Sequence, residues 1–291
     1  MINAPDARGV LCSPDTQKLI RHHVTNAHIE VIPLRSALEG IKAFPTARTL
    51  TVTCSSKFGL DRSLELCSAA VAHGHQVIPH VAARQIPDRE ALRTLVGRLV
   101  GLGIRTLFVV GGDIRDPVGK YRNARQLLDD LSGLNHGIEH IGVPCYPEGH
   151  PKITQETLLD DLHHKQEYAH YMVSQLCFDA ATIVTWLRSV RQEGIALPLR
   201  LGLAAPMNAA KLVRLSLKIG VGSSLRFLSK QHGIVGNLIG GSEYRPEDLL
   251  ARIGNEQRWA ELSIAGVHLF SFNQIESTTA WQSEIARRMA A

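Results

Sequence analysis

Short apolar runs alternate with longer amphipathic segments along most of the chain. The clearest run, Thr106 to Val110 (TLFVV), has no alternating polar positions, which predicts a strand covered on both faces, as in a parallel sheet. Seven more segments are strand candidates of this kind: 27–34, 49–54, 75–82, 140–146, 171–178, 197–204 and 266–272.

The segments between these strands have the apolar spacing of helices. Helices are predicted at 14–24, 61–73, 88–102, 121–131, 155–168, 180–192, 209–218, 223–231, 246–255 and 279–289. Eight strands that alternate with helices over 291 residues predict an α/β fold, a closed (β/α)8 TIM barrel, with extra helices after the seventh strand.

The alternative fold is an open doubly wound sheet. No GxGxxG motif follows the first strand, which counts against a Rossmann dinucleotide site there. We therefore expect a lead-in helix within residues 1–26 and a single catalytic barrel over residues 27–291.

Composition narrows the class of protein. No apolar run approaches the roughly 18 residues of a membrane span, and the N-terminus lacks a signal-peptide pattern, so we expect no membrane partner and a cytoplasmic location. Five scattered cysteines without CxxC spacing indicate neither a disulfide framework nor a metal site. The net charge of +5 is spread along the chain, which favours anionic small molecules over nucleic acid.

Polar residues near the strand ends carry the candidate chemistry, because a β/α barrel places its active site at the carboxyl ends of its strands. Glu30 lies inside the first strand, and an unpaired carboxylate there is costly, so a function is favoured over a structural role. Asp113 follows the fourth strand and is as well suited to cap a helix as to do chemistry. His80 ends the third strand, where a hydrogen-bonded core histidine is an equal alternative.

Three further positions belong to the same set. Gln175 lies in an apolar strand, where its amide needs a partner, which favours a ligand contact. Thr53 ends the second strand but is a good strand residue in any case. Tyr146 and His150 flank a rigid Pro-Glu-Gly loop of the kind that often holds binding residues.

Other signals are weaker. The segment GVGSSL (220–225) could form a phosphate-binding helix N-terminus, but a turn between helices is the simpler interpretation. The adjacent histidine pairs at 22–23 and 163–164 do not face one another on a helix, which argues against metal ligation. Cysteines 54, 145 and 177 lie near strand ends, where small buried thiols are the common case.

The order of several motifs resembles the catalytic barrel of the methylenetetrahydrofolate reductase family. The matching segments are IEVIP, TVTC, PHVAAR, VVGGD, PCYPEGHP, VSQLCFD and GVHLFSF, which together cover roughly residues 27–282. The resemblance implies reduction of 5,10-methylenetetrahydrofolate to 5-methyltetrahydrofolate, a step of one-carbon metabolism and methionine biosynthesis. It also implies a non-covalent FAD and an NADH or NADPH donor. We expect the catalytic barrel only, without the regulatory domain of larger relatives.

Carried over position by position, the resemblance assigns roles to the candidate residues. Glu30 would protonate the folate N10, and Gln175 would hydrogen-bond the pterin. Asp113 would lie close to the pterin and the flavin and tune the electronics of the flavin. The residues expected to line the FAD are Thr53, His80, Tyr146 and His150, with Lys165 near its phosphates.

The chain departs from the family pattern at three places. Gly111 stands where an arginine is usual, and Arg84 is the residue that could replace its flavin contact. Cys54-Ser55 replaces a Tyr-Gly pair, and Asn208-Ala209 replaces a substrate-stacking aromatic residue. The alternatives are therefore a flavin-free reductase, a folate-dependent one-carbon or methyl transferase, or a non-catalytic folate-binding protein. A homo-oligomer stays open, since no sequence feature addresses it.

Overall fold

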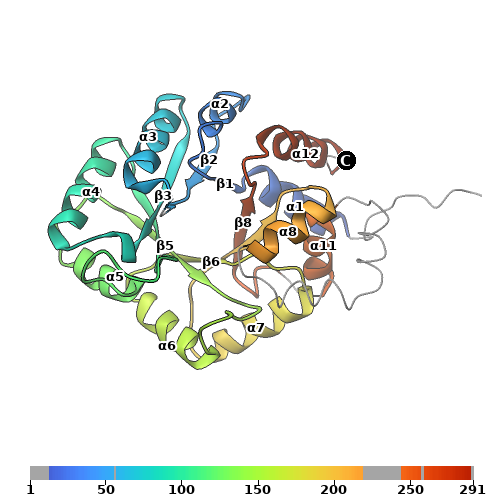
Figure 1. Cartoon of the computed structure of the whole chain (residues 1–291). Helices are drawn as coiled ribbons and strands as arrows, with labels where there is room; N and C mark the ends of the chain where they lie inside the picture. Colours follow the sequence, from blue (N-terminus) through green and yellow to red (C-terminus); the bar gives the residue numbers. More distant parts are fainter. Residues whose placement is uncertain (1–12, 56, 219–243, 257–258, 290–291) are drawn as a thin grey trace, which may run out of the picture.

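Eight parallel strands close into a barrel that is ringed by helices (Figure 1). The computed structural model describes residues 13–55, 57–218, 244–256 and 259–289. The strands are β1 (His28–Val31), β2 (Thr49–Val52), β3 (Gln76–Ala82), β4 (Thr106–Val110), β5 (His140–Cys145), β6 (Tyr171–Ser174), β7 (Leu199–Ala204) and β8 (Ile264–Phe270). They pair in chain order, and β8 closes the barrel on β1. The prediction of a (β/α)8 barrel is confirmed.

The helices follow the strands in alternation. They are α1 (Pro14–Thr25), α2 (Ala37–Lys42), α3 (Gly59–Ala72), the 3-10 turn η1 (Ala83–Gln85), α4 (Arg89–Gly101), α5 (Ala124–Ser132), α6 (Gln155–Lys165), α7 (Ala180–Gln192), α8 (Ala209–Lys218), α11 (Pro246–Glu256) and α12 (Ile275–Arg288). Two predicted features, the helix at 223–231 and the loop GVGSSL, lie outside the described residues. Each helix in the described part of the chain is too short or too polar to span a lipid bilayer.

Strand β4 shows why the apolar runs form this sheet. Leu107 and Val109 face the helices and are fully buried, while Phe108 points inside the barrel, where it packs with Ile78 and Val173. A strand buried on both faces needs apolar residues at every position, which is the pattern of TLFVV. The main core therefore lies between strands and helices, and a smaller one fills the barrel.

Side-chain caps fix where several helices begin. The Asp88 carboxylate accepts the Ala91 N–H at 2.8 Å, and the Asn123 side chain accepts the Gln126 N–H at 3.1 Å. Such caps satisfy amide groups that have no partner within the helix. They explain why α4 and α5 begin directly after these residues.

The structure adds a helix to the sequence expectation and moves several boundaries; the sixth strand, for example, ends at Ser174 and not at 178. The short helix α2 was not predicted, because six residues are too few to establish helical periodicity. Helix α12 begins at Ile275 and not at 279. The hydroxyls of Ser277 and Thr278 donate to the carbonyl of Gln274, so these polar residues form the first turn of the helix.

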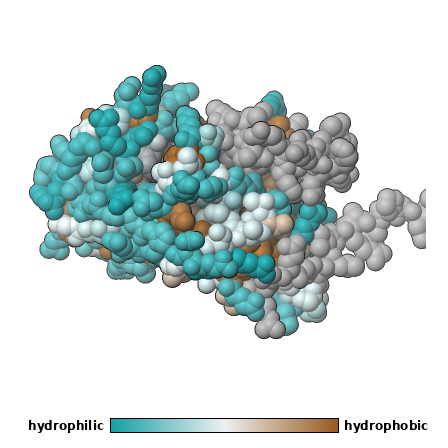
Figure 2. Space-filling model, turned by 90° about the horizontal axis from the view of Figure 1, so that it is seen from below, coloured by the Kyte–Doolittle hydropathy of each residue, from teal (hydrophilic) through white to brown (hydrophobic). Residues whose placement is uncertain are grey.

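On the face seen in Figure 2, hydrophilic residues predominate and hydrophobic residues form small patches between them.

Candidate functional site

A carboxylate and two imidazoles meet inside the barrel. Glu30 projects inward from β1, and its Oε2 atom lies 3.4 Å from Nε2 of His268 on β8 and 3.9 Å from Nε2 of His80 on β3. The side chains of Glu30 and His80 are 12% and 11% exposed, and that of His268 is 2% exposed. The three groups are therefore largely shielded from water, which strengthens the electrostatic interactions between them.

Aromatic rings enclose this cluster. The His80 ring lies 4.7 Å from the ring of Phe108, and the His268 ring lies 4.9 Å from that of Phe270. Burial lowers the pKa of His80 to about 4, although the nearby Glu30 carboxylate opposes the change. His80 is thus neutral near pH 7, and its Nε2 atom is buried without a hydrogen-bond partner among the described residues.

The segment after β8 anchors the backbone of β1 beside this cluster. Ser271 donates its hydroxyl to the Glu30 carbonyl, and the Asn273 amide bonds both polar atoms of the Ile32 backbone, at 2.8 Å to N–H and 2.9 Å to C=O. Phe272 and Asn273 have φ values of 50° and 61°, which non-glycine residues rarely adopt. These bonds hold a strained turn against β1 and so position Glu30.

The end of β4 bears Asp113 at the surface. Asp113 is exposed, three residues beyond the last residue of β4. It follows Gly112, whose φ of 92° suits glycine, and a Cβ there would lie 3.2 Å from the Ala82 Cβ. The glycine pair therefore lets the chain turn closely over β3, and Asp113 is exposed directly after this turn.

Arg84 lies beneath this turn and is occupied by the backbone. Its Nε donates to the Arg122 carbonyl at 2.7 Å and its Nη1 to the Ile114 carbonyl at 3.1 Å. Its own N–H donates to the Gly111 carbonyl at 3.0 Å. The guanidinium thus holds the loop after β4, and a flavin contact would have to compete with those two bonds.

Gln175 and Thr53 lie one residue beyond their strands. The Oε1 atom of Gln175 accepts the N–H of Leu176 at 2.8 Å, which fixes the side chain and leaves its amide N–H groups without a partner among the described residues. The Thr53 N–H donates to the Val31 carbonyl at 3.0 Å. Both side chains are half-buried at the carboxyl ends of the strands, as expected.

The loop after β5 is tied to the start of α7. Glu148 accepts the N–H groups of Phe178 and Asp179 at 2.9 and 3.2 Å. The rings of Tyr146 and His150 meet edge to face at 5.1 Å. Burial raises the pKa of Tyr146 to about 12 and lowers that of His150.

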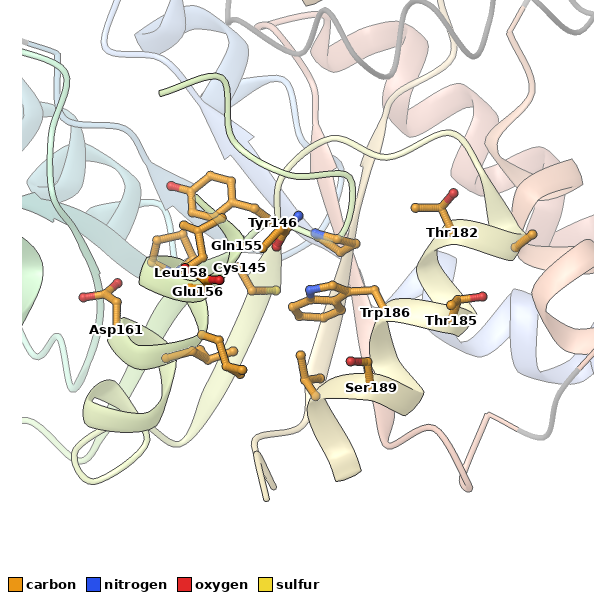
Figure 3. A pocket seen from close by; sticks show the side chains of 16 residues that line it. Cys145, Tyr146, Gln155, Glu156, Leu158, Asp161, Thr182, Thr185, Trp186 and Ser189 are labelled. Atoms are coloured by element: carbon orange, nitrogen blue, oxygen red, sulfur yellow. The ribbon is translucent and has the colours of Figure 1, made fainter. Parts of the chain in front are cut away.

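Lys165 and the pocket beside it lie outside the barrel. Lys165 is 5% exposed and forms an ion pair with Asp161 of the same helix. A cavity of about 590 Å³ separates α6 from α7 (Figure 3), with Cys145 and Trp186 reaching into it from β5 and α7. Tyr146 lines it as well, but Glu30, His80 and His268 do not, so this cavity is distinct from the cluster around Glu30.

His268 and Asn273 were not singled out from the sequence. His268 is a polar residue in the otherwise apolar run GVHLF, and it shares the inward face of its strand with Phe270. That signal marks His268 as unusual but does not identify its neighbour. Its contact with Glu30 arises only from the closure of β8 on β1.

Comparison with known proteins gives one family match. The family model described as methylenetetrahydrofolate reductase matches residues 33–223. Among solved structures, tryptophan synthase from M. tuberculosis is 12% identical with a TM-score of 0.49, covering 96% of this chain and 98% of that chain. Dihydropteroate synthase from Thermus thermophilus is 13% identical with a TM-score of 0.44, covering 89% of this chain and 94% of that chain. Likenesses at this level carry no functional argument.

Proposed function

The chain belongs to the methylenetetrahydrofolate reductase family, and on that premise we propose that it reduces 5,10-methylenetetrahydrofolate to 5-methyltetrahydrofolate. Family membership implies an oxidoreductase that acts on a folate. The observation that supports the specific reaction is the Glu30 carboxyl, held inside the barrel mouth between two imidazoles. The reaction needs one hydride and one proton, and we assign the proton to Glu30.

Glu30 acts as the general acid. In its protonated form it gives its proton to the folate N10, the bond from N10 to the bridging carbon breaks, and an iminium remains at N5. Hydride addition to that carbon completes the methyl group, and Glu30 regains a proton from solvent. General acid catalysis of this kind typically contributes about 10²- to 10⁴-fold to the rate.

The two histidines serve this carboxyl in different ways. His268 lies at hydrogen-bond distance from Oε2 and, being almost fully buried, fixes the carboxyl orientation. His80 is neutral near pH 7 and therefore places no positive charge beside Glu30. Its unpartnered Nε2 atom offers a hydrogen bond to a bound molecule at the mouth.

Gln175 and Asp113 complete the substrate site. The amide N–H groups of Gln175 are free to donate to the pterin, and its carbonyl is already fixed by Leu176. Asp113 is exposed at the same end of the barrel and accepts a hydrogen bond from the pterin N–H groups. Carboxylate and amide groups are the usual partners of a pterin's donor and acceptor edge.

We propose that FAD would supply the hydride, with NADH or NADPH as the electron donor. The orphan Nε2 of buried His80 and the half-buried Thr53 fit the polar edge of a flavin ring, and Tyr146 and His150 extend that surface. The flavin, when bound, supplies hydride chemistry that no protein side chain has. The chain's own residues bind it and exclude water.

A flavin-free reductase, in which the nicotinamide gives hydride directly to the folate, is the second candidate. One observation favours it: both cations assigned to the FAD are engaged elsewhere, Arg84 by two carbonyls and Lys165 by Asp161. Gly111 adds no charge in their place. The phosphates of FAD would then have to be held by other residues.

The absorbance spectrum of the purified protein separates the two candidates. A yellow preparation, or one that turns yellow and active on addition of FAD, supports the flavin route. A colourless protein that stays colourless with FAD but oxidises NADH or NADPH with methylenetetrahydrofolate supports the direct route. Absence of folate-dependent oxidation under both conditions would refute the reductase function.

A further inference from the structure

A second cavity lies at the opposite end of the barrel from Glu30. It has a volume of about 640 Å³ and is lined by the first residues of six strands together with the loops that precede them. His28 begins β1, His140 begins β5 and Tyr171 begins β6, so these side chains belong to the amino end of the barrel. We call this space the amino-end cavity.

Three polar side chains meet within it. The Arg200 guanidinium carbon lies 5.9 Å from the centre of the Tyr171 ring, and the His28 ring lies 6.2 Å from the same ring. His28 is 8% exposed, and its Nδ1 atom has no hydrogen-bond partner among the described residues. The Arg200 guanidinium and the Tyr171 hydroxyl likewise form no hydrogen bond within the described part of the chain, so three sets of polar atoms remain available together.

Two glycines make room for this arrangement. A Cβ atom on Gly142 would lie 2.4 Å from Cζ of Tyr171, and one on Gly266 would lie 2.5 Å from Nη1 of Arg200. Either contact would be too close, so any other residue would displace the phenol or the guanidinium. The two glycines therefore leave space for the phenol and the guanidinium that any other side chain would occupy.

The cavity is also basic without a counter-charge. None of its 18 lining residues, all within the described chain, is acidic, whereas Arg105, Arg200 and four histidines line it. The guanidinium of Arg105 donates to the carbonyls of Val100 and Ile104. Of the two arginines that line the cavity, Arg200 is therefore the one without a partner among the described residues. A half-buried guanidinium without a carboxylate is costly, and an anion would offset that cost. Burial lowers the pKa of His28 to about 2, and the nearby Arg200 charge acts in the same direction, so the His28 ring is neutral near pH 7.

We propose that the amino-end cavity binds a phosphate-bearing small molecule through Arg200, Tyr171 and His28. The planar guanidinium fits two oxygens of one phosphate, and the phenol and imidazole donate to others. Three converging donor groups suit a tetrahedral phosphate better than a two-oxygen carboxylate. The volume exceeds that of a phosphate ion, so the body of the ligand lies along the apolar wall formed by Ile78 and Leu102.

The test is a titration of the full chain with inorganic phosphate at constant ionic strength, with chloride as the balancing anion. Saturable binding is followed by calorimetry and by ³¹P line broadening. Arg200→Gln should weaken binding by about tenfold or more, since a charge-assisted bond is lost. Tyr171→Phe keeps the ring and removes only the hydroxyl, so it should weaken binding about threefold. Arg93→Gln, an exposed arginine paired with Glu90, is the matched control for loss of one charge.

The outcomes separate the site from general electrostatics. Unchanged phosphate affinity in Arg93→Gln and in Glu30→Gln, with losses in Arg200→Gln and Tyr171→Phe, supports the proposal independently of the reductase activity. No saturable binding, an equal loss in Arg93→Gln, or acetate bound as tightly as phosphate would overturn it. If Arg200→Gln does not fold, as judged by circular dichroism, Tyr171→Phe and His28→Gln decide the question.

Discussion

Asn273 gives a quantitative test of how the barrel holds Glu30. The change Asn273→Ala removes two hydrogen bonds to the Ile32 backbone, at 2.8 and 2.9 Å, and leaves a non-glycine residue at a φ of 61°. Each lost bond costs about 1 kcal/mol, and alanine at positive φ costs about 1 kcal/mol more than asparagine. We expect Asn273→Ala to lower the free energy of unfolding by about 3 kcal/mol, a large share of the typical 5–15 kcal/mol.

Asn273→Gly separates the two contributions. It loses the same hydrogen bonds but tolerates the positive φ, so we expect a loss of about 2 kcal/mol, about 1 kcal/mol less than for alanine. Urea unfolding with an unchanged m value measures both. Ser36→Ala, an exposed serine whose side chain makes no capping hydrogen bond, is the control and should change stability by less than about 0.5 kcal/mol. Wild-type stability in Asn273→Ala, or equal losses in the two variants, would refute the reasoning.

The same variants should impair catalysis, because Asn273 anchors the backbone at Ile32, two residues after Glu30. A shift of the carboxyl by about 1 Å can cost up to about 100-fold in rate. We expect kcat to fall more than tenfold in both Asn273 variants. The two variants should have similar kcat values although they differ in stability. Wild-type kcat in a folded Asn273→Gly would show that this turn does not position Glu30.

Two further predictions concern buried histidines and the loop after β4. His28 and His80 have pKa values lowered to about 2 and about 4 by burial, so the unfolded chain binds more protons than the folded one below pH 6.5. The free energy of unfolding should therefore decrease as the pH falls from about 6.5 towards 4, and His80→Gln should reduce that slope in urea titrations; an unchanged slope would contradict it. Arg84→Gln breaks the bonds to the Ile114 and Arg122 carbonyls, so we expect faster protease cleavage in this loop and a higher KM for folate. Arg93→Gln should change neither, and an unchanged cleavage rate in Arg84→Gln would count against the assigned role.

Apolar patterning was enough to predict the barrel. Runs such as Thr106–Val110 can be buried on both faces only in a sheet that helices cover, and their alternation with amphipathic segments leaves few topologies. The described strands begin and end within a few residues of the predicted ranges. The boundaries that moved, such as the start of α12, depend on hydroxyl-to-carbonyl bonds, which periodicity does not record.

The site was less accessible from the sequence. Glu30 and His80 were predicted to share the barrel mouth, and the structure places them 3.9 Å apart. His268 lies 238 positions from Glu30 in the chain, and only the β1 to β8 register brings them together. The hydrogen bonds from Arg84 to loop carbonyls could not be predicted either. A sequence shows which cationic side chains are present but not which acceptors they bind.

The most direct test of Glu30 as the acid is a comparison of two rates in Glu30→Gln. Glutamine keeps the shape and a hydrogen bond to His268 but cannot protonate N10. We expect formation of 5-methyltetrahydrofolate to fall about 10²- to 10⁴-fold, while folate affinity and oxidation of the nicotinamide donor by bound flavin stay within about twofold of wild type. Undiminished folate reduction, or an equal loss of folate reduction, folate affinity and donor oxidation, would contradict the assignment of Glu30 as the proton donor.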